Sequence, residues 1–139
     1  MRFDKLTTAF QQALADAQSL AVARDKSLDE EAKATAMEAA TVVAGEVPLR
    51  VVHLCRDAAR LAQTIATIGN VNAATDAAVG AIMARAAAEG AGLNVRINSI
   101  ALKDRARAEA WRAEVATLLA EVNDIAAAAV ATATGRGGF

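Results

Sequence analysis

The segment "RARAEAWRAEVATLLAEVNDIAAAAVA", residues 105–131, decides the fold class. Its apolar residues recur at alternating steps of three and four, and this spacing is typical of the seam along which one helix packs on others. The seam comprises Ala108, Trp111, Val115, Leu118, Val122, Ile125 and Ala129. The pattern predicts a long helix from Arg105 to about Ala131 that buries one face.

The composition extends this prediction to the whole chain of 139 residues, a length that fits one domain. Hydrophobic residues make up 55% of the sequence but aromatic residues only 3%. Much of the apolar content is alanine, the best helix former, whereas β-sheets favour β-branched and aromatic residues. The sequence therefore predicts an all-α, up-and-down bundle of long helices, completed by self-association.

Three further helices are expected, over residues 4–24, 28–68 and 76–100. Pro48 lies inside the second of them. Because proline has no backbone N–H and disfavours helical geometry at the residue before it, we expect a kink or a short break there. Boundary signals between the helices are a capping box at Ser27 and Glu30, a stop at Gly69, a cap at Thr75 and a turn at "KDR", residues 103–105.

The charge balance excludes some classes of partner. Fifteen basic and sixteen acidic residues leave a net charge of −1, which provides no field to attract nucleic acid or an anionic membrane. Because the sequence opens with the charged "MRFDK", no signal peptide is expected. No uninterrupted apolar run is long enough to span a bilayer. We expect a cytoplasmic protein that binds neither nucleic acid nor membranes.

His53 and Cys55 are the only histidine and the only cysteine, so the ligand spacing of known zinc sites is missing and no metal is expected. Both residues lie in the helical pattern "VVHLCRDAARLA". A buried thiol is favoured over a nucleophile at Cys55, and a half-buried or surface histidine over a catalytic one at His53.

The stretch "GNVNAATDAAVGAIMARAAAEGAGLNVRIN", residues 69–98, places polar residues within an apolar region. Steps of three and four put several of them, together with small residues, on one slowly drifting stripe. The stripe comprises Asp76, Gly80, Met83, Ala87, Gly90, Asn94 and Asn98. Two interpretations remain open: a tight helix–helix contact with amides bonded across it, or the floor of a ligand-binding cleft.

From residue 27 to about residue 134 the chain resembles the cyclodeaminase/cyclohydrolase family. That family includes the C-terminal domain of formimidoyltransferase-cyclodeaminase and the methenyltetrahydrofolate cyclohydrolases. The matching words occur in one order, as "DEEAKA", "VPLRV" followed by "LC", "GNVNAATDAAVGA" and "LNVRIN". The family's Asp-Ala-Gly-Val is replaced here by Asp-Ala-Ala-Val at residues 76–79.

The resemblance implies an all-helical, dimer-forming protein that acts on a one-carbon tetrahydrofolate derivative without a metal. It implies a catalytic role for Asp76 and substrate-binding roles for the remaining motif positions, which are Asn70, Asn72, Asn94, Arg96 and Asn98. Cyclodeaminases of the family close formimino-tetrahydrofolate and release ammonia, whereas cyclohydrolases open the methenyl ring with water.

The family's N-terminal helices and its Pro-Gly-Gly-Gly loop have no counterpart here, so we expect a chain truncated on that side. Residues 1–25 instead resemble the first helix of the N-terminal domain of Clp-type disaggregases. The expected organisation is a chimera, with this helix at 1–25, the cyclodeaminase/cyclohydrolase-like region at 26–134 and a flexible tail at 135–139. Two functions remain open: a folate enzyme or its inactive descendant, and a non-catalytic helical oligomer.

Overall fold

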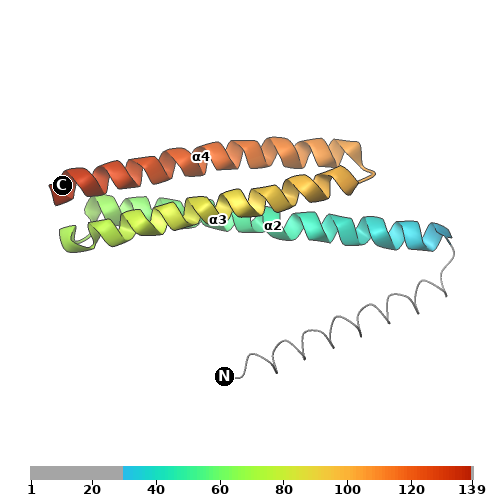
Figure 1. Ribbon diagram of the computed structural model, residues 1–139, viewed down its shortest axis with the longest axis horizontal. Coiled ribbons are helices and arrows are strands. Elements are labelled where there is room, and N and C mark those ends of the chain that lie inside the picture. The colour runs from blue at the N-terminus through green and yellow to red at the C-terminus, as the bar shows by residue number, and fades with distance from the viewer. Residues whose placement is uncertain (1–29, 139) are drawn as a thin grey trace, which may run out of the picture. The chain divides into compact units, whose positions relative to one another are not determined.

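A computed structural model describes residues 30–138 of the chain. They form α2 (Glu30–Ile68), the 3-10 helix η1 (Val71–Ala73), α3 (Ala74–Ala101) and α4 (Arg105–Gly137), which Figure 1 shows as long helices joined by short connections. No strand occurs in this part of the chain, so the prediction of an all-α fold is confirmed. The helix predicted over residues 4–24 and the cap predicted at Ser27 lie outside the described residues.

The chain divides into two compact units, Met1–Ala39 and Ala40–Phe139. Within the second unit, His53 of α2 pairs with Glu114 of α4, and Arg60 pairs with Glu121. Both steps are seven residues, so α2 and α4 run in the same direction. α3 runs the opposite way, since Ala78 packs near Ala133 and Val95 near Val115. The up-and-down topology is therefore confirmed.

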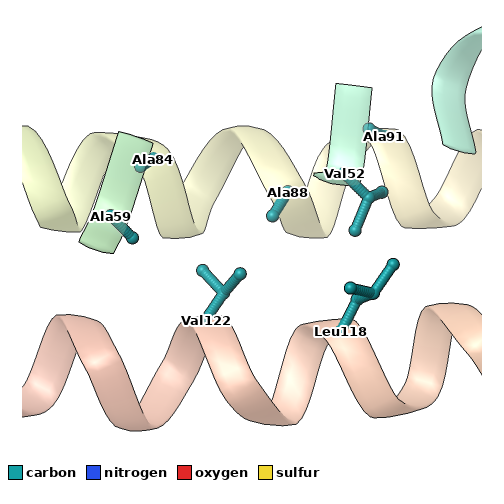
Figure 2. Packing of buried hydrophobic residues seen from close by; sticks show 7 residues of the cluster. All are labelled: Val52, Ala59, Ala84, Ala88, Ala91, Leu118 and Val122. Atoms are coloured by element: carbon teal, nitrogen blue, oxygen red, sulfur yellow. The ribbon is translucent and has the colours of Figure 1, made fainter. Parts of the chain in front are cut away.

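The centre of this unit is filled by small side chains from three helices. In one cluster, Val52 and Ala59 of α2 meet three alanines of α3 and two larger residues of α4. Figure 2 shows Leu118 and Val122 pointing from α4 toward these alanines, which are Ala84, Ala88 and Ala91. Alanine on α3 leaves room for the larger side chains of α4, which is the complementary packing that a dense core needs.

The seam predicted on α4 is the buried face of that helix. Ala108, Trp111, Val115, Leu118, Val122 and Ala129 are all buried, as the spacing predicts. Only Ile125 differs, because Ala126 takes the fully buried place and Ile125 packs at the edge of the core. A straight helix has 3.6 rather than about 3.5 residues per turn, so a regular seam drifts around it and shifts by one residue.

α2 continues through Pro48 without the short break that was one of the two expected outcomes, and the other, a kink, stays a prediction. Proline removes one hydrogen bond of the helix, but the neighbouring turns remain tied to the bundle. Gly45 is buried against the ring of Trp111, and Leu49 packs against the cluster that contains Trp111. Packing on both sides of the proline keeps the backbone helical.

The connection between α2 and α3 differs in detail from the prediction. α2 ends at Ile68 as expected, with the Gly69 N–H donating to the Ile65 carbonyl over 2.8 Å. The following residues form η1 instead of an irregular loop. The predicted cap at Thr75 is wrong, because α3 begins at Ala74 and its capping residue, Ala73, makes no side-chain bond. The 3-10 turn already leads the chain into helical geometry without such a cap.

A buried polar contact joins α3 to α4 near their connection. Ser99 is fully buried, and its Oγ donates to the Arg96 carbonyl over 2.7 Å. The same oxygen accepts from Nε of Arg112 over 2.9 Å. Asp104 begins α4 by accepting from the Arg107 N–H over 3.0 Å, so the turn predicted at residues 103–105 is confirmed.

α4 extends beyond its predicted end, into the segment expected to be flexible. It continues to Gly137, and Gly138 closes it in the left-handed conformation with φ 70°. Arg136 provides the anchor, because its guanidinium donates to the Gly69 carbonyl over 2.7 Å and also to the Ala66 carbonyl. The last turn of α2 has no basic residue of its own, so Arg136 supplies the positive charge that a helix C-terminus favours.

By length and composition, α4 is the described helix that could cross a membrane, with a mean hydropathy of 1.4 over eighteen residues. A core helix of a soluble protein passes the same test. In α4 the apolar stripe faces α2 and α3, but only 28% of those eighteen residues are buried. The expected cytoplasmic location stays a prediction.

Candidate functional site

A groove of about 420 Å³ lies between α2 and α3 beside Pro48. From α2 it is lined by Ala44, Val47, Pro48 and Val51, and from α3 by Ala87, Gly90, Ala91, Asn94 and Asn98. We call it the Pro48 groove. Its floor is the C-terminal part of the stripe predicted on α3, from Ala87 to Asn98, together with Ala91. Most of these residues are glycine or alanine, so only small side chains cover α3 there.

Asn94 and Asn98 are the polar groups of the Pro48 groove. Nδ2 of Asn94 donates to the Gly90 carbonyl over 3.0 Å. Nδ2 of Asn98 donates both to the Asn94 carbonyl, over 2.8 Å, and to the Ala44 carbonyl of α2, over 3.0 Å. The two amide groups are thereby held in place, and each keeps its Oδ1 as an acceptor.

The other predicted site residues lie elsewhere. Asn70 caps η1, with its Oδ1 accepting from the Asn72 N–H over 3.0 Å. Asp76 is exposed in the first turn of α3. Its Cα lies about 20 Å from that of Gly90, since fourteen residues of helix rise 1.5 Å each. Arg96 is exposed and does not line the groove. Two of the six predicted residues are therefore brought together at the groove.

The chemistry of the Pro48 groove follows from its lining. Among the described residues around it, none has an ionisable side chain. Valine, proline and alanine walls suit a flat, largely apolar group, and the side-chain oxygen of Asn94 is an acceptor for an N–H donor. The lining of the groove holds no acid or base for proton transfer.

The sequence did not indicate that α2 forms one wall of the groove. Val47, Pro48 and Val51 were assigned only to a helix and its interruption, although "VPLRV" is one of the words that carry the family resemblance. A usable signal was the proline itself. It removes the donor that would pair with the carbonyl four residues earlier, at Ala44, and so leaves an acceptor for another helix.

His53 and Cys55 both lie outside the groove. His53 is half-buried, and its Nε2 lies 2.8 Å from Oε1 of Glu114, so it joins α2 to α4 as a structural residue. Cys55 packs against the core cluster that contains Val52. Within residues 30–138, no three His, Cys, Asp or Glu side chains come together as a metal would require.

Cys55 is expected to react slowly with alkylating reagents. Desolvation by burial raises the pKa of its thiol, so the reactive thiolate is scarcer at a given pH than in an unfolded chain. Iodoacetamide labelling, followed by mass spectrometry, should be slower for the folded protein than in urea. Its rate should also rise at higher pH than that of a free cysteine. Equal rates in the folded and unfolded protein would contradict this.

The sequence is similar to known proteins of one family. The model of the family described as formiminotransferase-cyclodeaminase matches residues 3–117. The methenyltetrahydrofolate cyclohydrolase of Methylorubrum extorquens is 41% identical over 98 residues, which cover 69% of this chain and 47% of that protein. The chain thus spans about half the length of this relative. The family match also includes most of the Clp-like segment at 1–25, and the division at residue 26 stays a prediction.

Proposed function

The chain belongs to the formiminotransferase-cyclodeaminase family, and we propose that it binds a one-carbon derivative of tetrahydrofolate in the Pro48 groove. One observation carries this proposal. Asn94 and Asn98, both in the word "LNVRIN" that carries part of the family resemblance, line a single groove with the proline of "VPLRV". The similarity to a methenyltetrahydrofolate cyclohydrolase supports the choice of ligand class.

The shape and polarity of the groove suit such a ligand. A reduced pterin is a flat ring system with N–H donors along one edge, and the side-chain oxygen of Asn94 is an acceptor that could meet that edge. Val47 and Val51 offer apolar surface for the ring faces. The groove has a volume of about 420 Å³ and is largely open to solvent, so a ligand in it would keep one face exposed.

We propose ligand binding alone for the groove, with no role for Asp76. A general base must come within hydrogen-bond reach of the group on which it acts. Asp76 lies about 20 Å along α3 from Gly90 by the rise of the helix. It therefore cannot serve a ligand in the groove of the same chain, and turnover by Asp76 would require a different site.

Gly90→Ala should raise stability and weaken ligand binding. A Cβ at this position meets no atom within 4 Å, and alanine in place of a helical glycine stabilises by up to about 1 kcal/mol. The added methyl group occupies part of the groove, which should weaken binding roughly tenfold. Thermal unfolding, and calorimetric titration with a chemically stable tetrahydrofolate derivative, measure the two effects.

Two further variants locate the site. Asn94→Ala removes an acceptor in the groove, so binding should weaken three- to tenfold, roughly the value of one hydrogen bond. Stability should change little, because the higher helix propensity of alanine compensates for the hydrogen bond lost within α3. Asp76→Asn is the control and should bind as the parent does. The proposal is wrong if the parent shows no saturable binding, or if only the Asp76 variant loses affinity.

A second property, self-association, is favoured by the uneven distribution of exposed apolar residues. All large exposed apolar side chains among residues 30–138 belong to α2, η1 or α3, and none to α4. Leu54 and Leu61 on α2, and Met83 and Leu93 on α3, are each more than 60% exposed. Faces of this kind mark protein contacts. We propose that a second copy of the chain covers this face, in a symmetric dimer.

Leu61→Glu combined with Met83→Glu should convert the dimer to a monomer without unfolding it. Both positions are exposed, so the charges remain hydrated in the monomer but would be desolvated in the contact. Light scattering after size exclusion gives the mass, and circular dichroism checks the helix content. Ala116→Glu, on the exposed side of α4, is the matched control. A monomeric parent, or a doubly substituted protein that stays dimeric, contradicts the proposal.

A further inference from the structure

Pro48 leaves one carbonyl of α2 without its usual partner. In a continuous α-helix the N–H of residue 48 donates to the carbonyl of residue 44. Proline has no N–H, yet α2 passes through this position unbroken. The Ala44 carbonyl is therefore left without its usual donor from the helix, and Ala44 lines the Pro48 groove.

Asn98 supplies that donor from α3. Its Nδ2 lies 3.0 Å from the Ala44 oxygen and 2.8 Å from the Asn94 oxygen. An amide nitrogen has two hydrogens, so both are used on backbone carbonyls, one in each wall of the groove.

We propose that Asn98 is a positioning residue of the Pro48 groove. Its side chain replaces the hydrogen bond that Pro48 removes from α2 and fixes α2 to α3 at the level of the groove. Any ligand is contacted by Asn94 and the apolar walls, and Asn98 acts on it only through the placement of α2. The stability part of this proposal is independent of folate binding, and the part about the ligand rests on the function proposed above.

A cycle of four proteins tests the proposal: the parent, Asn98→Ala, Pro48→Ala and the protein with both changes. Alanine at position 48 restores the N–H, so the Ala44 carbonyl regains a partner in its own helix. Asn98→Ala should raise the unfolding constant by roughly three- to tenfold in the parent, the value of one hydrogen bond. In the Pro48→Ala background the same change should alter it less than about twofold. Equal factors in both backgrounds would overturn the proposal.

The carbon-13 shift of the Ala44 carbonyl provides a direct readout that a general loss of stability would not move. It should change in Asn98→Ala, return toward the parent value in the protein with both changes, and stay constant in Asn94→Ala. An Ala44 shift that ignores Asn98→Ala would overturn the proposed bond.

Ligand titrations of the same proteins separate positioning from contact. Pro48→Ala with and without Asn98 should bind the tetrahydrofolate derivative with affinities within about twofold, because the groove no longer depends on Asn98. A tenfold loss on removing Asn98 in that background would show that it touches the ligand and would overturn its assignment. If the parent binds no folate, the proposed function fails, and the unfolding cycle and the carbonyl shift alone decide this inference.

Discussion

Leu118→Glu is expected to unfold the bundle rather than to separate one copy of the chain from another. Leu118 is 5% exposed and packs against α2 and α3 within a single chain, as Figure 2 shows. Removing a buried leucine side chain alone costs about 2–5 kcal/mol, and an unpaired buried carboxylate adds to that loss. The total approaches the whole stability of a domain of this size.

Urea unfolding followed by circular dichroism measures this effect. The matched control is Ala116→Glu, which introduces the same charge at an exposed position of the same helix. The control should shift the free energy of unfolding of the monomer by about 0.5 kcal/mol or less, as exposed substitutions usually do. A Leu118→Glu protein as stable as the control would show that α4 does not turn its seam toward α2 and α3.

Gly45→Ala is expected to destabilise the protein by up to about 2 kcal/mol, against the usual trend for a glycine inside a helix. Alanine should gain about 1 kcal/mol in helix propensity. A Cβ at residue 45, however, would lie 2.5 Å from Cη2 and 2.9 Å from Cε3 of Trp111. The indole ring is rigid and held in the core by Val95 and Val115, so α2 and α4 must move apart, and such overpacking costs about 1–3 kcal/mol or more.

Gly80→Ala is the matched control for this prediction. A Cβ there lies 4.0 Å from that of Ala62, an ordinary contact, so the change should stabilise the protein by up to about 1 kcal/mol. Chemical unfolding of both variants gives opposite signs if Gly45 is the point of closest approach between α2 and Trp111. Two stabilised variants would contradict that packing.

The sequence was sufficient to predict the path of α4. Burial along one helix depends on spacing that is visible locally, and residues from Ala108 to Ala129 carry it without interruption. The same reasoning predicted the end of α2 at Ile68 and the turn after α3, because Gly69 and Asp104 act on their own neighbours.

Pro48 shows where local rules were insufficient. Taken alone, a proline predicts an interruption. The helix continues because Asn98, fifty residues later in the chain, donates to Ala44, and because Gly45 and Leu49 pack beside Trp111. The spacing of the α2 sequence contains no information about which residue of α3 lies opposite.

The sequence predicts one stripe along the whole of α3, but only part of that stripe lines the groove. Periodicity places Asp76 and Asn98 on similar sides of the helix. The structure adds which part of the neighbouring helices lies beside each of them along the helix axis. α3 is 28 residues long, or roughly 40 Å, so one stripe passes different neighbours. Only its second half, from Ala87 to Asn98, meets the proline of α2 and forms a groove.

The most direct test of the central claim is to map amide chemical shifts of the labelled protein during titration with a stable tetrahydrofolate derivative. Binding in the Pro48 groove predicts saturable shifts at Val47, Val51, Gly90 and Asn94, with the amides around Asp76 unchanged. Shifts centred on Asp76 and η1 would place the site at the other end of α3. Either that pattern or no saturable shifts at all would contradict the account.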